Sequence, residues 1–327
     1  MEKIDFEALT SILKENKDKS IVLTFHSRGD TDSVSSAIAL STYFPNSKVL
    51  TPDMITSNSS RIIKKLGFEE TIPNQFDNTA DMVVMLDVNN FEDCGPFARK
   101  LEQFTGKIVI IDHHLLKETG KDNTYVFNEE SYNSAASITY KLLKSLGANV
   151  EKKIAKLLLT GIVSDSAELK NVTADTFTQI GELLKIADTD YQVLLDEMIH
   201  ISDPGSRAKT MDDVRNASTT IEGEMLLVVG EAHAHANLAA DAALRIGADF
   251  SLFRAENDSE VSFSARLRAP LDKKYGIHLG RMMKELAPII KGSGGGHPCA
   301  AGAYGPINAD WRKFQEMFMD QIYKRIK

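Results

Sequence analysis

Residues 108–114 read Ile-Val-Ile-Ile-Asp-His-His, a short apolar run followed directly by an acid and two histidines. Short runs that are rich in β-branched residues and carry few charges are typical of strands covered on both faces, as in a parallel sheet. Ile21–Phe25 and Met82–Leu86 are two further runs of this kind. Helical patterns alternate with them, which predicts a doubly wound, mostly parallel α/β domain. The expected helices span residues 35–43, 59–66, 134–146, 154–163 and 174–186.

Length and composition set the scale of the molecule. At roughly 100–200 residues per domain, the 327 residues predict two domains. The formal charge of −8 excludes a passive binder of long nucleic acid, which needs a basic surface. The chain has two cysteines, too few for a disulfide framework, and its N-terminal stretch lacks the apolar core of a signal peptide. We therefore expect a soluble, cytoplasmic protein without a membrane span.

The alternation of strands and helices changes near residues 188–220, where Asp203-Pro204-Gly205 marks a turn among polar residues. Strand patterns resume from Glu222 with fewer helices between them, and the chain ends in a helical pattern at Trp311–Ile326. We expect a catalytic domain over residues 1–187, a partly helical linker over 188–220, and a smaller mixed α+β domain over 221–327 that faces the first domain across a cleft.

Acids and histidines follow the three predicted strands, and one more acid follows a helical run. Because neighbouring parallel strands deliver their carboxyl ends to one edge of a sheet, the three strand-end clusters should converge there. Each cluster alone has a plain structural explanation, as a helix-capping turn or a solvated loop. Their coincidence at successive strand ends favours a metal site. The residues are His26, Asp30 and Asp32 after the first strand, Asp87 after the second, Asp112, His113 and His114 after the third, and Asp165 after the helix.

The donor types indicate which metal such a site would bind. Imidazoles and carboxylates without thiolates suit Mn²⁺, Co²⁺, Fe²⁺ or Mg²⁺ better than a structural zinc. Several carboxylates packed together with no cation between them would repel one another strongly. Paired divalent ions would remove this repulsion, and they are the usual means of activating water against a phosphoryl centre. We therefore predict two divalent ions, with Mn²⁺ as the first choice and Co²⁺ or Mg²⁺ as alternatives.

Two further motifs lie in the C-terminal part. Residues 292–302 read Gly-Ser-Gly-Gly-Gly-His-Pro-Cys-Ala-Ala-Gly, and successive glycines expose backbone N–H groups to an anion, although a flexible loop entering an Ala-rich helix is the alternative. The strand pattern of residues 260–269 places alternate polar residues on one face, where a guanidinium could bind a phosphate; an exposed edge strand is the alternative. The substrate-binding residues predicted from these motifs are Ser264, Arg266, Arg268, Gly294, Gly295, Gly296 and His297.

The motifs of residues 26–32, 87, 112–114 and 165 resemble those of the DHH phosphoesterase superfamily. The stretch 292–302 resembles the signature of its DHH-associated C-terminal domain, which family II pyrophosphatases lack, and the combination is most similar to the RecJ-like, nanoRNase and pAp phosphatase branch. The resemblance implies catalytic roles for Asp87, Asp112 and His114, with His114 facing the scissile phosphate and Asp112 fixing the imidazoles. It implies one ion on His26, Asp30 and Asp87 and a second on Asp32, Asp87, His113 and Asp165.

We therefore expect a two-metal phosphohydrolase that cleaves short oligonucleotides, dinucleotides such as pApA, or pAp by metal-activated water. An exonuclease acting on longer single strands is the nearest alternative, although no basic, aromatic-rich segment is evident for stacking bases. A nucleotide-binding sensor without activity is the alternative from outside the enzymes, but no metal ligand is lost. The expected partner is a short oligonucleotide or nucleotide and not a membrane, and a homodimer is possible.

Overall fold

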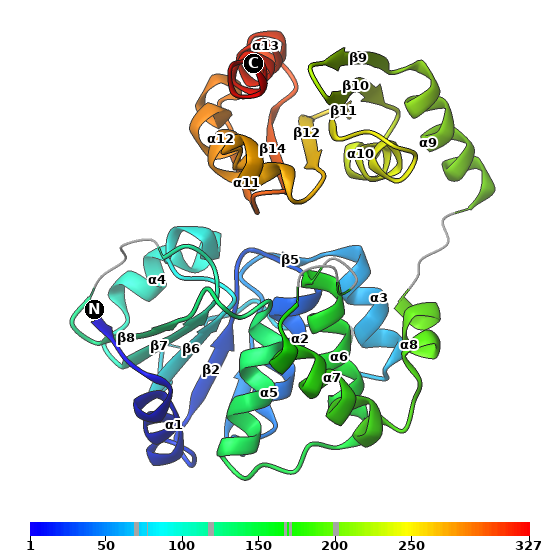
Figure 1. The fold of residues 1–327 in the computed structure, drawn as a ribbon. Coiled ribbons are helices and arrows are strands. Elements are labelled where there is room, and N and C mark those ends of the chain that lie inside the picture. Colours follow the sequence, from blue (N-terminus) through cyan, green and yellow to red (C-terminus); the bar gives the residue numbers. More distant parts are fainter. Residues whose placement is uncertain (69–71, 77, 117–120, 167–168, 170–171, 199–202) are drawn as a thin grey trace. The chain divides into compact units, whose positions relative to one another are not determined.

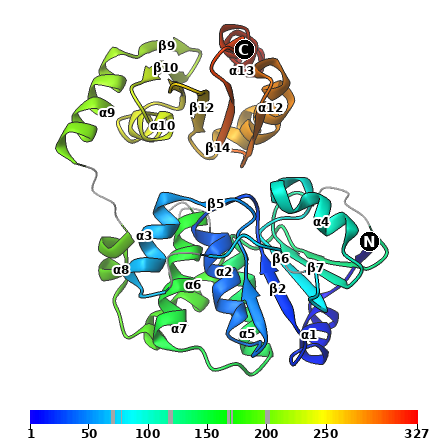
Figure 2. The same ribbon diagram turned by 180° about the vertical axis from the view of Figure 1, so that it is seen from behind.

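The computed structural model divides the chain into two compact units, Met1–His200 and Ile201–Lys327 (Figures 1 and 2). The division falls within residues 188–220, the stretch that the sequence predicts as a linker. None of the helices described has the length and apolar character needed to cross a membrane. The structure describes residues 1–68, 72–76, 78–116, 121–166, 169, 172–198 and 203–327.

A parallel sheet of six strands forms the centre of the first unit, in the spatial order β1–β8–β7–β6–β2–β4. The three predicted strands are the neighbours β2, β6 and β7, so the acids that follow them leave the sheet side by side. β8, which the sequence did not single out, pairs with β7 on the other side. The strands are β1 (Glu2–Lys3), β2 (Ile21–Thr24), β4 (Ser47–Val49), β6 (Met82–Leu86), β7 (Lys107–Asp112) and β8 (Thr124–Asn128), with β3 (Arg28–Gly29) and β5 (Met54–Ile55) in a separate two-stranded sheet.

Both faces of the six-stranded sheet are covered, as its apolar strands predict. Val109 and Ile111 of β7 belong to the core on one face, whereas Ile108 and Ile110 pack on the other face with Phe97. The doubly wound α/β prediction is therefore confirmed. The core on the first face includes residues of α1 (Phe6–Glu15), α2 (Thr31–Ser41), α3 (Ser57–Lys65), α5 (Ala135–Ser145), α6 (Lys152–Asp165), α7 (Ala174–Ala187) and α8 (Tyr191–Met198), and the core on the second face includes residues of the 3₁₀ helix η1 (Glu92–Phe97) and α4 (Ala98–Gln103).

Side-chain caps fix where these helices begin. Asp5, Ser134 and Thr173 each accept a hydrogen bond from the backbone N–H three residues later, which satisfies a donor that the first turn leaves unpaired. Gly147 directly follows the last turn of α5 with a φ of 69°, a conformation that glycine adopts without steric cost. Local sequence therefore fixes both ends of α5, whose first residue contacts Asp32.

The second unit holds a mixed sheet in the order β13–β14–β12–β11–β10–β9, in which only β10 and β11 run parallel. Its mixed α+β character is as predicted. The elements are α9 (Pro204–Asn216), β9 (Ser218–Glu222), β10 (Met225–Ala232), α10 (Ala236–Arg245), β11 (Phe250–Glu256), β12 (Glu260–Leu267), α11 (Leu271–Tyr275), α12 (Leu279–Leu286), the 3₁₀ helix η2 (Ala287–Ile290), β13 (Ser293–Gly296), β14 (Ala300–Pro306) and α13 (Trp311–Ile326).

Candidate metal centre

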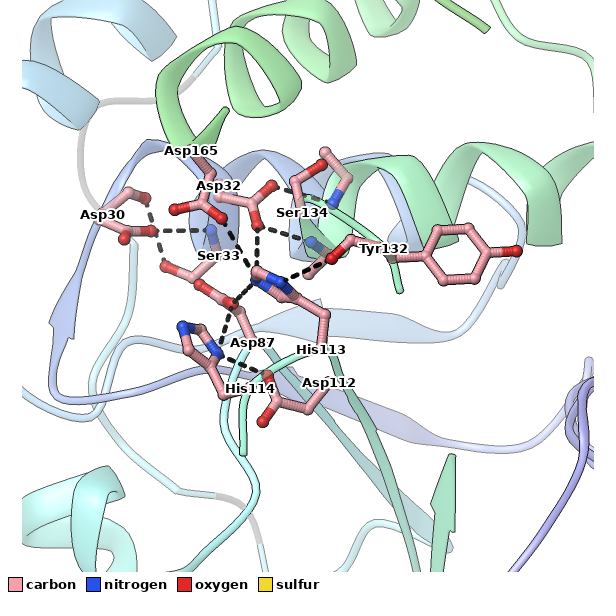
Figure 3. A network of polar contacts seen from close by, with 12 residues as sticks. Asp30, Asp32, Ser33, Asp87, Asp112, His113, His114, Tyr132, Ser134 and Asp165 are labelled. Carbon is pink, nitrogen blue, oxygen red and sulfur yellow. Dashed lines mark hydrogen bonds and ion pairs between the residues drawn. The ribbon is translucent and has the colours of Figure 1, made fainter. Parts of the chain in front are cut away.

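The carboxyl ends of β2, β6 and β7 bring the three predicted clusters together, and the last residue of α6 adds Asp165 (Figure 3). The structure thus assembles every residue that the sequence predicts as a metal ligand. Their donor atoms fall into three overlapping groups, within each of which the atoms lie within 4.8 Å of one another. The groups are His26, Asp30 and Asp87; Asp32, His113 and Asp165; and Asp87, Asp112, His113 and His114.

Asp87 is the residue that links the first two groups. Its Oδ2 lies 3.8 Å from Nε2 of His26, and its Oδ1 lies 3.3 Å from Nε2 of His113. The backbone of Asp87 has a φ of 59°, and its N–H donates to the carbonyl of Ile111 on the neighbouring strand. This left-handed conformation turns the chain sharply as it leaves β6, and aspartate tolerates it better than most residues. The turn places one carboxylate oxygen toward each group.

Asp30 and Asp32 bracket the first residue of α2 and are held in different ways. Asp30 is the N-cap of α2, and its Oδ1 accepts a hydrogen bond from the N–H of Ser33 at 2.9 Å. Asp32 is buried and accepts the N–H groups of Ala135 and Ala136, at 2.6 and 2.9 Å, from the start of α5. The positive end of that helix favours the negative charge of Asp32. Two helix N-termini therefore orient the two carboxylates.

His113 has its two ring nitrogens in different surroundings. Nδ1 lies 3.2 Å from the carbonyl oxygen of Tyr132, which can only accept a hydrogen bond, so Nδ1 carries the proton. Nε2 then directs a lone pair toward the carboxylates of Asp87 and Asp165, each 3.3 Å away. An imidazole fixed through one nitrogen by a backbone carbonyl is the usual arrangement of a metal ligand.

His114 and Asp112 form a hydrogen-bonded pair, in which Nδ1 of His114 lies 2.9 Å from Oδ1 of Asp112. Burial alone would raise the pKa of Asp112, yet its hydrogen bond to His114 and the charge of that ring hold the pKa below its usual range. Burial alone would lower the pKa of His114, but the hydrogen bond to Asp112 and the nearby carboxylates raise it to about 9. The other oxygen of Asp112 accepts a hydrogen bond from the amide of Asn89, a residue that the sequence analysis did not single out.

The donor set fits divalent cations. Burial, followed by repulsion from neighbouring carboxylates, raises the pKa of Asp32 and of Asp87 well above the usual range. Oδ1 of Asp87 is buried and accepts no hydrogen bond from the residues that the structure describes. Cations placed among these oxygens would neutralise the repulsion, and a set of carboxylates and imidazoles suits Mn²⁺, Co²⁺ or Mg²⁺.

Three of the predicted substrate-binding residues lie on or next to β12. Arg266 donates through Nη1 to the hydroxyl of Ser264, 2.9 Å away, so these two side chains share one face as predicted. Nε of Arg266 also pairs with Asp241 of α10 at 2.7 Å. Arg268 lies one residue beyond the end of β12 at Leu267, and its N–H still bonds the carbonyl of Asp249 in register with β11. Its guanidinium bonds to Asp249 and to the carbonyls of residues 244 and 248, which ties the end of α10 to the sheet.

The glycine motif forms a strand rather than a loop, and no helix follows it. β13 pairs with β14, so that Gly294, Gly295 and Gly296 lie opposite Ala303, Gly302 and Ala301. Close approach of α12 accounts for Gly294, because a Cβ there would lie 2.6 Å from the carbonyl oxygen of Met283. Gly296 has a φ of 128°, and a Cβ there would lie 2.5 Å from the carbonyl oxygen of Ala300 in its own hairpin. A Cβ on Gly295 would meet nothing within 4 Å among the described residues, and His297 is exposed just beyond the strand.

Comparison with known proteins gives the family. Residues 20–162 match the model of the DHH family, N-terminal domain, and residues 229–324 match the DHHA1 domain. The chain belongs to the DHH phosphoesterase superfamily. Members of this superfamily are metal-dependent phosphoesterases. The two matches include both the candidate metal centre, except for Asp165, and the β12–β14 region.

Relatives of this DHH protein extend over different shares of the chain. An uncharacterized protein of Methanocaldococcus jannaschii is 26% identical over 325 residues, which is 96% of each chain. A probable manganese-dependent inorganic pyrophosphatase of Streptococcus pyogenes is 26% identical over 189 residues, 54% of this chain and 60% of that protein.

Solved structures support the fold. An exopolyphosphatase-related protein from Bacteroides fragilis aligns with a TM-score of 0.76 at 18% identity and covers 97% of this chain and 95% of its own. RecJ from Thermus thermophilus in complex with Mn²⁺ aligns with a TM-score of 0.53 at 14% identity, over 95% of this chain and 53% of that one.

Proposed function

We propose that this DHH protein is a phosphohydrolase that uses two divalent ions, Mn²⁺ first, to cleave short oligonucleotides, dinucleotides such as pApA, or pAp. The observation that carries the proposal is the placement of Asp87, whose two oxygens face His26 and His113 at 3.8 and 3.3 Å. A carboxylate so placed suits a ligand shared between two ions. His26, Asp30 and Asp87 would hold one ion, and Asp32, Asp87, His113 and Asp165 the other.

The pair of ions would supply a water nucleophile near neutral pH and neutralise charge on the phosphoryl oxygens. The remaining task of the protein is to hold the metal-binding side chains in place and to position the phosphate. His113 keeps its proton on Nδ1 against the Tyr132 carbonyl, so that Nε2 stays a donor of electrons to the metal. His114 keeps Nδ1 on Asp112, and its Nε2 is the atom proposed to donate a hydrogen bond to the scissile phosphate.

The second unit is proposed to bind the terminal phosphate of the substrate. Arg266 and Ser264 share one face of β12, and a guanidinium there suits an anionic oxygen. A Cβ on Gly295 would meet nothing within 4 Å among the described residues, and His297 is exposed, so both can be reached by a substrate. End binding of this kind favours short substrates, and the net charge of −8 disfavours a long polynucleotide track.

The test is a hydrolysis panel with Mn²⁺ that contains pAp, pApA, RNA of two to five nucleotides, a single strand of about 25 nucleotides and pyrophosphate. We expect the shortest oligonucleotides or pAp to be cleaved fastest. Faster cleavage of the long strand would identify an exonuclease, and preference for pyrophosphate would identify a pyrophosphatase. Tight nucleotide binding without hydrolysis would identify a sensor.

The matched control uses two aspartates that both have a positive φ. Asp87→Asn removes the shared ligand, while Asp188→Asn changes an exposed aspartate that also has a positive φ, 51°, at the end of α7. Hydrolysis should disappear in the first variant and persist in the second. Equal activity in both would overturn the assignment of Asp87 as the shared ligand.

A further inference from the structure

We infer that Asn89 is a positioning residue for His114 and acts through Asp112. The inference rests on the proposed function for its effect on turnover, since His114 is the side chain proposed to contact the scissile phosphate. Asn89 lies in the segment that leaves β6, two residues after Asp87, and only 3% of it is exposed. Asn89 follows β6, whereas His114, the residue that it would position, follows β7.

The main chain of His114 is held from the β8 side. Nδ2 of Asn128, the last residue of β8, donates to the carbonyl oxygen of His114 at 3.0 Å. On the β6 side, Nδ2 of Asn89 donates to the carbonyl oxygen of Leu115, the next residue, at 3.2 Å. An asparagine at the end of β8 and another just after β6, the two strands that flank β7, therefore hold the backbone next to the side chain of His114. The remaining freedom lies in the side chain.

The ring of His114 is oriented by Asp112, and Asp112 is oriented by Asn89. Oδ1 of Asp112 bonds Nδ1 of His114 at 2.9 Å, and Oδ2 accepts from Nδ2 of Asn89 at 2.5 Å. The carboxylate is fully buried, and rotation about its Cβ–Cγ bond is limited by these two bonds together with a backbone hydrogen bond from His113. Without the amide of Asn89 the carboxylate can rotate, and the hydrogen bond between Oδ1 of Asp112 and Nδ1 of His114 loses its alignment.

The second ring nitrogen of His114 shows why this matters. Figure 3 shows it pointing away from Asp112 and Asp87, while Nδ1 faces both of them. Nε2 is the ring atom proposed to face the substrate, and its direction is set by the Asp112 bond at the opposite side of the ring. Outer partners that orient such groups typically contribute about 10- to 100-fold to activity.

The neighbouring Asn90 provides a matched control. It is as buried as Asn89 and carries the same amide, but it bonds the N–H and the carboxylate of Asp93 in η1 instead of Asp112. Asn89→Ala should lower kcat about 10- to 100-fold while KM and Mn²⁺ affinity change by less than about threefold. Asn90→Ala should keep kcat within about threefold of wild type. A fall in Mn²⁺ affinity that accounts for the lost activity would overturn the inference.

A double-mutant cycle tests whether the effect passes through the histidine. In a His114→Ala background, Asn89→Ala should cost less than about twofold in kcat, because the group it positions is already missing. A full loss in both backgrounds would show that Asn89 acts elsewhere. If Asn89→Ala does not fold, Asn89→Ser, which keeps a shorter hydrogen-bond donor, replaces it in the same cycle.

A second readout does not depend on hydrolysis. In the Mg²⁺-loaded full-length protein, the proton on Nδ1 of His114 should give a slowly exchanging low-field NMR signal, identified by its loss in His114→Ala. We expect this signal to persist in Asn90→Ala and to broaden or disappear in Asn89→Ala. Its persistence in Asn89→Ala, or its absence from the wild type, would overturn the positioning role. If the wild type cleaves no substrate of the panel, the proposed function fails while this measurement still decides the role of Asn89.

Discussion

Gly161 of α6 lies against the carboxylate of Asp32: a Cβ added at Gly161 would come within 3.1 Å of Oδ1 of Asp32 and 2.8 Å of the Cβ of Ala136. Glycine at this position lets α2, α5 and α6 meet closely around one metal-site acid. Helix α6 therefore has a residue of poor helix propensity in its interior, at the position where any larger residue would press against Asp32.

Gly161→Ala should therefore move Asp32 away from its place. We expect the free energy of unfolding to fall by about 1–3 kcal/mol through overpacking, and Mn²⁺ affinity to fall with it. Urea denaturation and calorimetric titration with Mn²⁺ measure the two effects. The control is Gly181→Ala in α7, where an added Cβ meets nothing within 4 Å and should stabilise by about 0.4–1 kcal/mol. Unchanged Mn²⁺ affinity in Gly161→Ala would contradict the expectation.

Asp87→Asn and Asp87→Ala should differ in stability but not in activity. Both remove the charge proposed to bind metal, so Mn²⁺-dependent hydrolysis should be lost in both. Asparagine tolerates the φ of 59°, whereas alanine should cost about 1–2 kcal/mol there. Asp87→Asn also removes a buried carboxyl whose pKa is raised, so the metal-free variant should unfold at a higher urea concentration than metal-free wild type. The reverse order of the two variants in urea would refute this account of the turn.

The metal-free protein should lose stability as the pH rises. The pKa of Asp32 and of Asp87 is raised above the ordinary 3.8, so the folded state binds more protons than the unfolded chain from that pH upward. The stability these groups contribute is complete below pH 3.8 and is lost as the pH rises through their folded pKa values. The raised pKa of His114, about 9, adds a loss of the same sign between pH 6.5 and 9.

Mn²⁺ should oppose this loss, because ions that bind the carboxylates displace their protons. At a hundredfold excess over its dissociation constant, Mn²⁺ should add about 2.7 kcal/mol, and the added stability should grow with pH. Urea unfolding in chelator and in Mn²⁺ at about pH 5.5 and 7.5 measures the difference. A metal-free stability that increases over this interval in wild type, or an unchanged slope in Asp87→Asn, would be inconsistent with the raised pKa values.

Arg266 and Arg268 should separate into a substrate residue and a structural residue. Arg266→Ala should raise KM about 10- to 100-fold, since a charge-assisted bond to phosphate is lost, with a smaller effect on kcat. Arg268→Ala should lower the free energy of unfolding by about 1–2 kcal/mol, because the carbonyls of Leu244 and Ala248 lose a donor, and should leave KM within about threefold. Steady-state kinetics and urea unfolding of both variants provide the check. Similar KM increases in the two variants would return Arg268 to the substrate site.

The residues of the candidate metal centre, apart from Asp165 at the end of α6, could be brought together from the sequence because they follow apolar runs that form neighbouring parallel strands, and such strands end together. The partners that orient them could not. Asp32 is held by the N–H groups of Ala135 and Ala136, and His113 is held by the carbonyl of Tyr132. These partners are main-chain groups, which nearly every residue carries, so the sequence does not identify them. Asn89 does carry its amide in its side chain, but nothing in the local pattern relates it to Asp112.

The glycine motif shows a different limit of sequence reasoning. Glycines open the backbone both to an anion and to a neighbouring helix, and the sequence does not distinguish the two uses. The structure assigns Gly294 to contact with α12 and Gly296 to a positive φ within the β13–β14 hairpin. Arg268 shows a related limit. The period-two argument follows it one residue past β12, where its N–H still bonds the carbonyl of Asp249 in register with β11, but it does not reveal that the guanidinium binds the carbonyls of Leu244 and Ala248.

The two roles of Asp30, as a helix cap and as a candidate metal ligand, have a consequence for which substitutions evolution can accept at this position. Asp30 caps α2 and also offers a donor to the metal centre, and asparagine caps a helix as well as aspartate does. A single nucleotide change of an Asp codon to an Asn codon would therefore remove a proposed metal ligand while leaving the helix intact. Both carboxylate oxygens of Asp32 accept N–H groups at the start of α5, and asparagine, whose amide has only one oxygen, cannot replace both of these bonds. Descendants that give up hydrolysis but keep the fold should carry asparagine, serine or threonine at position 30 more often than at position 32.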